Sequence, residues 1–499
     1  MTTSEAIKPD PAAPDPGADD RAVAPLPLVL DLDHTLIRCD ALQEMAVVYV
    51  RRNPLGVFRL VQWLAGGRAN LKRRLAERVE LDVETLPVNE ELAAFAAAEN
   101  DKGRPVVLAT AADETYARQV ADRFPFINTV IASDGVTNMK GATKADVLRA
   151  RYPGGFTYAG DSAADLPVWQ KAGGIILASA SPAIERKAER LGPVEARFAR
   201  PSRLRAFIKS ARPHQWAKNT LVFVPLILGG KVGDPGAWIA AALAFAALSL
   251  LASTTYLLND LFDLADDRRH WSKRARPLAS GRLPILYAVV ALPAGFLVSF
   301  ILGVLAGPAT LALLAAYLAI TIAYSVALKR QPILDAFSLA VLFTLRLGIG
   351  VAAAQVAVSP WLMVFSMFLF TSLSFAKRHT EVERMATRGE HRVAGRGYLS
   401  TDGPLIIAMG VASGLGAVLI MVLYLINDAF TAGLYQNAVW LWAFPPVLFL
   451  WIGRVWLLCH RGELHDDPVA FAVRDRPSLM LGGLMGLAFL AAWFGIGAG

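Results

Sequence analysis

The sequence predicts two fold classes in one chain. The first is an α/β domain with a parallel sheet and a helical cap; the second is an all-α membrane domain of about nine transmembrane helices. Before about residue 215, short apolar segments alternate with helical stretches, a pattern typical of doubly wound sheets. Beyond residue 219 the apolar runs approach the roughly 20 residues that cross a bilayer. Hydrophobic residues make up 55% of the chain, more than a soluble protein usually carries.

The first 25 residues are expected to form a disordered tail. They are rich in Pro, Ala and Asp, and they lack the basic start and apolar core of a secretory signal. The domain that follows should therefore stay in the cytoplasm.

The net charge of +8 comes largely from Lys and Arg that cluster beside the long apolar runs. This arrangement is typical of the cytoplasmic loops of a bacterial inner-membrane protein, and it argues against a nucleic-acid partner. Cys39 and Cys459 lie in different parts of the chain, so neither a disulfide nor a cysteine metal site is predicted.

The α/β domain is expected over residues 26–198. Its strands are predicted at 27–33, 105–110, 129–133, 156–161 and 174–178, and residues 41–98 are expected to form the cap. The first strand ends in acidic residues, and parallel sheets place their sites at the carboxyl ends of strands.

The polar residues that follow these strands suit the hydrolysis of a phosphate monoester. Asp31 can attack phosphorus to form an aspartyl-phosphate, while Asp33 can protonate the leaving oxygen and then activate water. Thr110 and Lys144 would hold the phosphoryl oxygens. One Mg²⁺ ion would be held by oxygens of Asp31, Asp161, Asp165 and the main-chain carbonyl of Asp33.

In order and in type, these motifs resemble those of the haloacid dehalogenase (HAD) phosphatase superfamily, most closely its phosphoserine-phosphatase-like members. The resemblance covers about residues 26–198 and implies a phosphatase domain. A non-catalytic relative is the alternative, and the presence of every expected group speaks against it.

Residues 199–218 are basic and are expected to form an amphipathic linker helix, either at the membrane surface or in contact with a ligand. The membrane domain follows over 219–499. Its nine spans are predicted at 219–231, 236–258, 284–304, 308–328, 332–354, 360–376, 404–426, 438–457 and 478–497. The Lys and Arg bias places the charged loops and the N-terminus inside, and an odd number of spans places the C-terminus outside.

The second predicted span ends in the pattern NDxxDxxxD, formed by Asn259, Asp260, Asp263 and Asp267. On a helix, the three carboxylates would share one face and repel one another unless a cation bridged them. Mg²⁺ holding a diphosphate explains the pattern, and Lys273 and Arg276 follow as counterparts for phosphate oxygens. A solvated charged loop is the alternative.

This segment resembles the UbiA prenyltransferase superfamily over about residues 205–499. Most members join a prenyl diphosphate to an aromatic ring and carry a second aspartate-rich motif. Here the matching segment, 324–346, supplies only Asp335, with Leu339 where another carboxylate would be wanted and with Lys329, Arg330 and Arg346 nearby. The site is therefore rich in cations and short of one acidic cluster.

The patterns RPHQWAKN, NDLFDLADDRRHWSKRARP, YSVALKRQPILD and AKRHTE are similar to the decaprenyl-phosphate phosphoribosyltransferase branch. That resemblance implies transfer of 5-phosphoribose from phosphoribosyl pyrophosphate to a polyprenyl phosphate. It implies Mg²⁺ held by Asp260 and Asp263, supported by Asp267, with Asn259 and Asp335 in the substrate site. The implied phosphate clamps are Lys218, Lys273, Arg276, Lys329, Lys377 and Arg378.

The two halves then suggest consecutive steps, because the transferase product would still carry a 5-phosphate monoester. Removing that group would give a polyprenyl-phosphoryl ribose. One rival is a prenyltransferase acting on a prenyl diphosphate and an aromatic acceptor; another is a lipid-binding scaffold joined to a phosphatase domain. Turnover of an aromatic acceptor would favour the first rival, and full activity after Asp260→Ala would favour the second.

Overall fold

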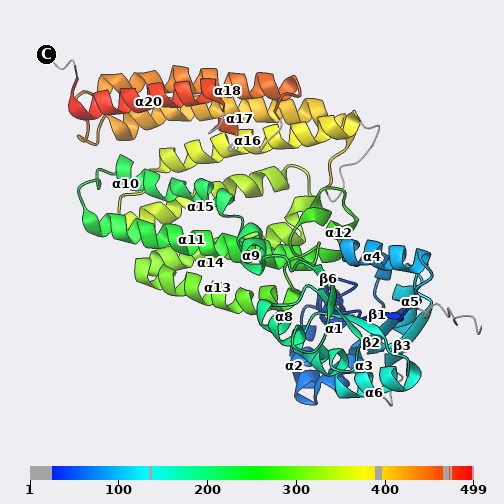
Figure 1. The fold of residues 1–499 in the computed structure, drawn as a ribbon. Coiled ribbons are helices and arrows are strands. Elements are labelled where there is room, and N and C mark those ends of the chain that lie inside the picture. The colour runs from blue at the N-terminus through cyan, green and yellow to red at the C-terminus, as the bar shows by residue number, and fades with distance from the viewer. Residues whose placement is uncertain (1–24, 134–137, 388–395, 465–470, 473–474, 497–499) are drawn as a thin grey trace, which may run out of the picture. The chain divides into compact units, whose positions relative to one another are not determined.

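The structure is a computed structural model, and it describes residues 25–133, 138–387, 396–464, 471–472 and 475–496. The chain divides after Pro201 into two compact units, drawn in Figure 1. This division falls within the predicted linker. Apart from Pro25, the predicted tail lies outside the described residues.

The first unit is built on a parallel sheet of six strands in the order β3-β2-β1-β4-β5-β6. The strands are β1 (Leu28–Leu30), β2 (Val106–Asp113), β3 (Thr129–Ser133), β4 (Thr157–Gly160), β5 (Gly174–Ala178) and β6 (Val194–Phe198). Five of them were predicted. The sixth, β6, has the half-buried, alternating pattern of an edge strand, and its two charged residues, Glu195 and Arg197, interrupt the apolar run that would reveal a strand in the sequence.

Helices cover both faces of this sheet. On one face, α4 (Glu90–Asp101) and α5 (Glu114–Ala121) pack on Leu28 and Leu30. On the other, α6 (Ala142–Arg151), α7 (Leu166–Trp169) and α8 (Pro182–Ala188) pack on Val29. Successive side chains of β1 point to opposite faces of the sheet, because a strand has a period of two. Since both faces are buried, the sequence of β1 is wholly apolar.

The cap is smaller than predicted. It consists of α1 (Ala41–Arg52), α2 (Gly56–Ala65) and α3 (Arg68–Ala76), which share their own small core around Tyr49 and Leu75. Helix α4 was expected to belong to the cap, but its Leu92 and Ala96 pack with β1 and β2. Helical composition identifies a helix without revealing which core it packs on.

In the described part of the second unit, eight helices are long and apolar enough to cross a membrane. They include α11 (Pro235–Phe262), α13 (Ile285–Ala306), α14 (Pro308–Val326), α15 (Leu334–Ala354), α16 (Pro360–Ala386), α17 (Gly403–Tyr424), α18 (Phe444–His460) and α20 (Arg476–Phe494). The unit is therefore a multi-pass membrane domain, as predicted. Helix α15 joins two groups, since it packs on α11 and α14 on one side and on α16 on the other (Figure 1).

The first predicted span, 219–231, is not a long helix. Its residues belong to a 3₁₀ helix, η3 (Pro213–Phe223), and to the short α10 (Val224–Leu228). This segment runs antiparallel to α11, because Trp216 bonds to Ser253, Asn219 bonds to Ser249, and Leu226 packs near Ala237. A 3₁₀ helix rises about 2.0 Å per residue, whereas an α-helix rises about 1.5 Å. This segment therefore runs beside most of α11 with fewer residues than an α-helix of the same length would need.

The predicted linker contains the helix α9 (Arg203–Ala211), which exposes Leu204 and Ile208. Beyond α11, the chain turns at Asp263 into the six-residue α12 (Leu264–Arg269). In the chain, α9 directly precedes η3, and α12 directly follows α11. The acidic motif begins at the end of α11 and continues into α12.

Candidate functional sites

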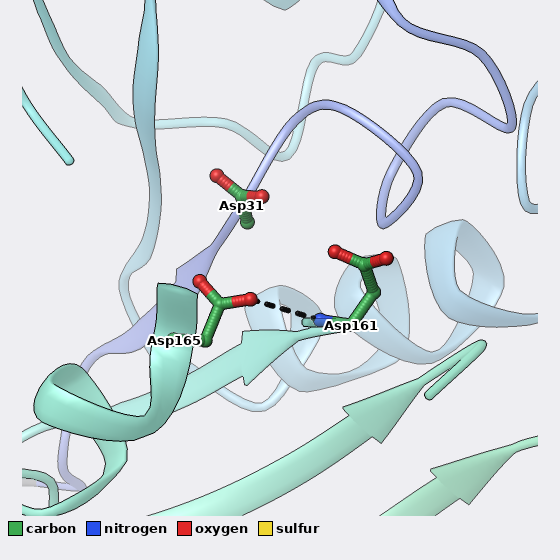
Figure 2. A group of neighbouring side chains, drawn as sticks. All are labelled: Asp31, Asp161 and Asp165. Carbon is green, nitrogen blue, oxygen red and sulfur yellow. Dashed lines mark hydrogen bonds between the residues drawn. The ribbon is translucent and has the colours of Figure 1, made fainter. Parts of the chain in front are cut away.

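The acidic residues of the soluble unit meet at the carboxyl ends of β1 and β4. Leu30 pairs with Ala159, so Asp31 follows one strand and Asp161 follows its neighbour. Asp165 comes from the short 3₁₀ helix η2 (Ala163–Asp165) just beyond. Oxygens from these three carboxylates lie within 4.8 Å of one another, as Figure 2 shows. Three convergent carboxylates fit a Mg²⁺ ion, which prefers oxygen ligands.

Asp165 is held by the protein itself. Its Oδ2 accepts hydrogen bonds from the main-chain N–H of Asp161 (3.2 Å, dashed in Figure 2) and of Ser162 (3.0 Å), and also from the Ser162 hydroxyl (3.0 Å). Its Oδ1 accepts from the Tyr158 hydroxyl at 2.8 Å. Gly160 makes this approach possible, because a Cβ there would lie 2.7 Å from the Asp165 carboxyl carbon. Asp165 therefore fixes the loop that carries Asp161.

Lys144, on α6, lies at the centre of this site. Its Nζ donates to Asp31 Oδ1 at 2.6 Å, to the Ala109 carbonyl at 3.1 Å and to the Tyr158 hydroxyl at 2.9 Å. The buried ammonium is thus aimed at the carboxylate that was predicted to attack phosphorus. Tyr158, which links Lys144 to Asp165, was not predicted, since a tyrosine inside a strand gives no sequence signal of its own.

Thr110 and Asp33 complete the predicted set. Thr110 is buried within β2, which runs three residues further than predicted, and its Oγ1 accepts from the Ala112 N–H at 3.0 Å. Asp33 Oδ1 accepts from the Ala41 N–H at 3.1 Å, at the start of α1. Burial, with Asp40 and Asp31 nearby, raises the pKa of Asp33 to about 7. Burial also raises the pKa of Asp31 to about 6, although the Lys144 ammonium opposes the rise.

These two pKa values predict a narrow bell-shaped pH profile for phosphatase activity. The rate should rise as Asp31 ionises near pH 6 and fall as Asp33 loses its proton near pH 7, because the nucleophile must be charged and the general acid protonated. Because the groups interact, the two limbs belong to the pair. The measurement is kcat/KM against pH. Excess Mg²⁺ should move the acidic limb to lower pH, and a flat profile across this range would contradict the assignment.

A cavity of about 500 Å³ lies between the cap and the core, and it is lined by Arg52 and Lys72 from the cap and by Tyr116 and Gln119 from α5. Lys72 also donates to the Ala111 carbonyl beside Thr110. The cavity is also lined by Arg78 and by the acids Glu77, Glu80 and Asp113, so its charge by itself does not select a substrate.

In the membrane unit, Asp260 is buried near the end of α11 and is contacted by two arginines. Arg212 Nη2 donates to its Oδ1 at 2.5 Å, and Arg276 Nη1 donates to the same oxygen at 3.1 Å. Arg276 Nη1 also donates to Asp267 Oδ2 at 2.6 Å, and Lys273 Nζ lies 3.9 Å from Asp267 Oδ1. One guanidinium therefore bridges two of the three predicted metal ligands.

Two carboxylate oxygens of this cluster, Asp260 Oδ2 and Asp267 Oδ1, are buried without a hydrogen-bond partner among the described residues. Buried oxygens of this kind normally have a partner, and a divalent cation would supply one. The residues present therefore fit a Mg²⁺ ion held at the end of α11.

The prediction that all three acids lie on one continuous helix is wrong for Asp263. Helix α11 ends at Phe262 and α12 begins at Leu264, with Asp263 between them in a non-helical conformation. The Asp267 N–H still donates to the Asp263 carbonyl at 2.8 Å. Within the described chain, the three carboxylates do not converge as tightly as Asp31, Asp161 and Asp165 do.

Asp335 is fully buried at the start of α15 and is surrounded by cations. Its Oδ2 lies 3.0 Å from Arg378 Nε and accepts from Arg396 Nη1 at 3.2 Å, while its Oδ1 accepts from the Tyr398 hydroxyl at 2.6 Å. Both arginines also pair with Glu381. Arg378 was predicted to clamp phosphate, but in this structure its guanidinium is committed to two carboxylates.

Removing the Asp335 carboxylate is expected to destabilise the membrane unit. Asp335→Ala would leave Arg378 and Arg396 with Glu381 but without the fully buried carboxylate that they share, at a cost of about 3–5 kcal/mol for a broken buried pair. Thermal unfolding in detergent measures the effect. Ser338→Ala is the matched control, because Ser338 is buried one turn away and, among the described residues, its hydroxyl donates to the Leu334 carbonyl within the same helix. Equal midpoints for the two variants would contradict the structural role of Asp335.

Arg346, on α15, is a buried cation whose described partners are all neutral. It donates to Asn219 Oδ1 at 3.0 Å, to the Leu342 carbonyl at 2.5 Å and to the Tyr317 hydroxyl at 3.1 Å. Its guanidinium carbon lies 4.7 Å from the Phe343 ring centre, and Lys218 Nζ lies 5.8 Å from the same centre. An uncompensated cation inside a helical bundle indicates a functional site.

The remaining predicted residues lie on other elements. Lys329 is in the 3₁₀ turn η5 (Leu328–Arg330), Lys377 is on α16 beside Arg378, and Asn259 precedes Asp260 on α11. Their role in phosphate binding stays a prediction. Arg212, Arg396 and Tyr398 were not among the predicted site residues, because only the fold brings them to Asp260 and Asp335.

Comparison with known proteins supports this two-part organisation. Residues 220–485 match the UbiA prenyltransferase family, and residues 28–170 match the haloacid dehalogenase-like hydrolases. An uncharacterized protein of Sinorhizobium fredii, y4nM, is 38% identical over 476 residues, which cover 94% of this chain and 91% of that protein.

Two further similarities concern the membrane half. The decaprenyl-phosphate phosphoribosyltransferase of Mycolicibacterium smegmatis is 35% identical over 185 residues, which cover 35% of this chain and 57% of that protein. The solved structure of a UbiA homologue from Archaeoglobus fulgidus, bound to DMAPP and Mg²⁺, covers 58% of this chain and 98% of its own, at 14% identity and a TM-score of 0.45. Because both family models match, the chain belongs to the UbiA prenyltransferase family and carries a haloacid dehalogenase-like hydrolase domain ahead of its membrane domain.

Proposed function

We propose that the membrane unit transfers 5-phosphoribose from phosphoribosyl pyrophosphate to a polyprenyl phosphate, and that the soluble unit then removes the 5-phosphate. The final product would be a polyprenyl-phosphoryl ribose. Both sites would face the cytoplasm at a bacterial inner membrane, which the Lys and Arg bias of the loops favours.

The observation that carries the proposal is the pairing of the buried Asp335 carboxylate with two arginines. An enzyme with two metal-binding acidic motifs needs carboxylates at both, yet here the second position supplies one acid that is neutralised by Arg378 and Arg396. A substrate anchored by one metal ion and by several cations fits this arrangement better than a prenyl diphosphate held between two acidic clusters. Phosphoribosyl pyrophosphate, with a pyrophosphate and a 5-phosphate, is such a substrate.

An anionic acceptor is supported by Arg346 and Lys218. Both cations lie near Phe343, and Arg346 has no carboxylate partner within the described residues. An aromatic acceptor would not need a cation such as Arg346, whereas a lipid phosphate would compensate its charge. The sequence similarity to phosphoribosyltransferases points the same way.

In the transfer step, an oxygen of the polyprenyl phosphate attacks C1 of the ribose as the bond from C1 to the pyrophosphate oxygen breaks. Arg212 and Arg276, together with Asp260, Asp263 and Asp267 through a Mg²⁺ ion, would stabilise the charge that develops on the leaving pyrophosphate. Bound Mg²⁺ supplies charge neutralisation there. Holding both reactants in place contributes further, because the reaction becomes effectively unimolecular.

In the second step, Asp31 attacks the phosphorus of the 5-phosphate, and Asp33 donates its proton to the departing 5-oxygen. Asp33 then accepts a proton from the water that hydrolyses the aspartyl-phosphate, which releases inorganic phosphate. Lys144 beside Asp31 would neutralise the transferred phosphoryl oxygens.

The full-length protein in liposomes, given ribose-labelled phosphoribosyl pyrophosphate, polyprenyl phosphate and Mg²⁺, tests the proposal. Mass spectrometry should detect labelled polyprenyl-phosphoryl ribose. Turnover only with a prenyl diphosphate and an aromatic acceptor would replace the proposal with an aromatic prenyltransferase. Product that keeps its 5-phosphate in the unmodified protein would separate the two domains into unrelated activities.

A further inference from the structure

The second cap helix, α2, has apolar side chains on two opposite faces. One face packs inward: Leu60 and Trp63 join the cap core. Gly56 lies so close to α1 that a Cβ there would sit 2.6 Å from the Tyr49 ring. This face alone accounts for the place of α2 in the fold.

The opposite face is exposed. Val57, Phe58, Val61 and Leu64 are 44%, 73%, 65% and 50% exposed, and Leu55 just before the helix is 80% exposed. At about 100° per residue, the four helical positions fall within an arc of roughly 120°. Four large apolar side chains on one solvent-facing arc form a contiguous patch, unlike the isolated exposed apolar residues that any soluble domain carries.

Exposed arginines lie on all three cap helices. Arg51 and Arg52 end α1, Arg59 lies on α2 itself, and Arg73 and Arg74 are on α3; all five are exposed. Over residues 41–78 the acidic residues are Glu44, which is buried, and Glu77, which pairs with Arg78. The cap therefore combines an apolar helix face with a strong positive charge.

We infer that the exposed face of α2, formed by Val57, Phe58, Val61 and Leu64, docks on the surface of an anionic bilayer. An apolar arc with basic flanks is the pattern of a helix that lies in the interface, where arginines pair with lipid phosphates and apolar side chains reach the acyl boundary. A protein partner would have to be acidic and apolar in matching places, whereas an anionic bilayer offers both features over its whole surface.

The first unit is tethered to a membrane-spanning unit of the same chain. The second unit crosses the membrane, and only residues 199–202 separate the last strand of the first unit from α9. Even weak docking would be favoured by this tether, since binding becomes intramolecular. The inference does not depend on the reaction proposed above.

A fluorescent label on α2 tests the docking in the full-length protein. Cys39 and Cys459 are both buried, so a cysteine introduced by Val61→Cys can be labelled selectively with an environment-sensitive dye. The protein is placed in nanodiscs of phosphatidylcholine with or without phosphatidylglycerol. Leu297→Cys, on the exposed side of the spanning helix α13, is the lipid-facing control; Glu91→Cys, exposed on α4, is the aqueous control.

We expect the label at position 61 to shift to the blue and to lose emission to a lipid-borne quencher when phosphatidylglycerol is present, as the label at 297 does in both lipids. High salt should reverse the effect at 61 only, because it screens the arginines from the lipid phosphates. A label at 61 that responds to aqueous iodide as fully as the label at 91 would overturn the inference. Protection from both quenchers would also overturn it and would identify a protein surface as the occupant.

Discussion

Replacing Asp31 with Asn is expected to reduce phosphate-monoester hydrolysis by at least about a thousandfold, because an amide cannot form the aspartyl-phosphate. The substitution keeps the size of the side chain and removes its charge beside Lys144. The measurement is release of inorganic phosphate from a soluble monoester and, in liposomes, the mass of the lipid product. The lipid product of the variant should be heavier by one phosphoryl group than the product of the unmodified protein.

The matched control for Asp31 is Asp122→Asn. Asp122 follows α5, its side chain is exposed, and it is not among the residues that line the cap cavity. This variant should retain full activity. The transferase activity of the Asp31→Asn protein serves as an internal check of folding. If Asp31→Asn leaves the final product unchanged, the assignment of the nucleophile and the two-step scheme both fail.

Replacing Asp260 with Asn is expected to reduce transfer to the lipid by on the order of 10²–10³-fold, the usual effect of removing one group that stabilises transition-state charge. Asp260 is buried, contacts Arg212 and Arg276, and has one oxygen that accepts no hydrogen bond from the described part of the chain. Its loss would therefore disturb both the metal ligands and the arginines. Labelled ribose incorporated into lipid measures the result, and excess Mg²⁺ should restore part of it.

Asp266→Asn provides the comparison for Asp260, since Asp266 is exposed on α12 within the same acidic segment. Transfer should be unchanged in that variant. Phosphatase activity should be normal in both variants, because its residues belong to the other unit. Full transfer by Asp260→Asn would contradict the assignment of Asp260 to the transfer site, whereas no transfer by the unmodified protein would favour the scaffold alternative.

The local patterns in the sequence were sufficient for most of the architecture. Strand–helix alternation predicted five of the six strands, and eight of the nine spans predicted from run length are long helices in the described residues, because both signals arise within one element. The segment at 219–231 was predicted as a span of ordinary length, yet it follows α11 as a 3₁₀ helix, which no apolar run length reveals. The predicted cap was too large because the sequence of helix α4 does not reveal which core the helix packs on.

What the sequence by itself determined is the chemistry available: carboxylates after β1 and β4, a lysine on α6, and an acidic motif at the end of a membrane helix. What only the tertiary structure decided is which charges meet. Arg212 reaches Asp260 across 48 residues, and Arg396 reaches Asp335 across 61. Ion pairs between distant segments depend on how helices pack, and short-range periodicity carries no record of that packing.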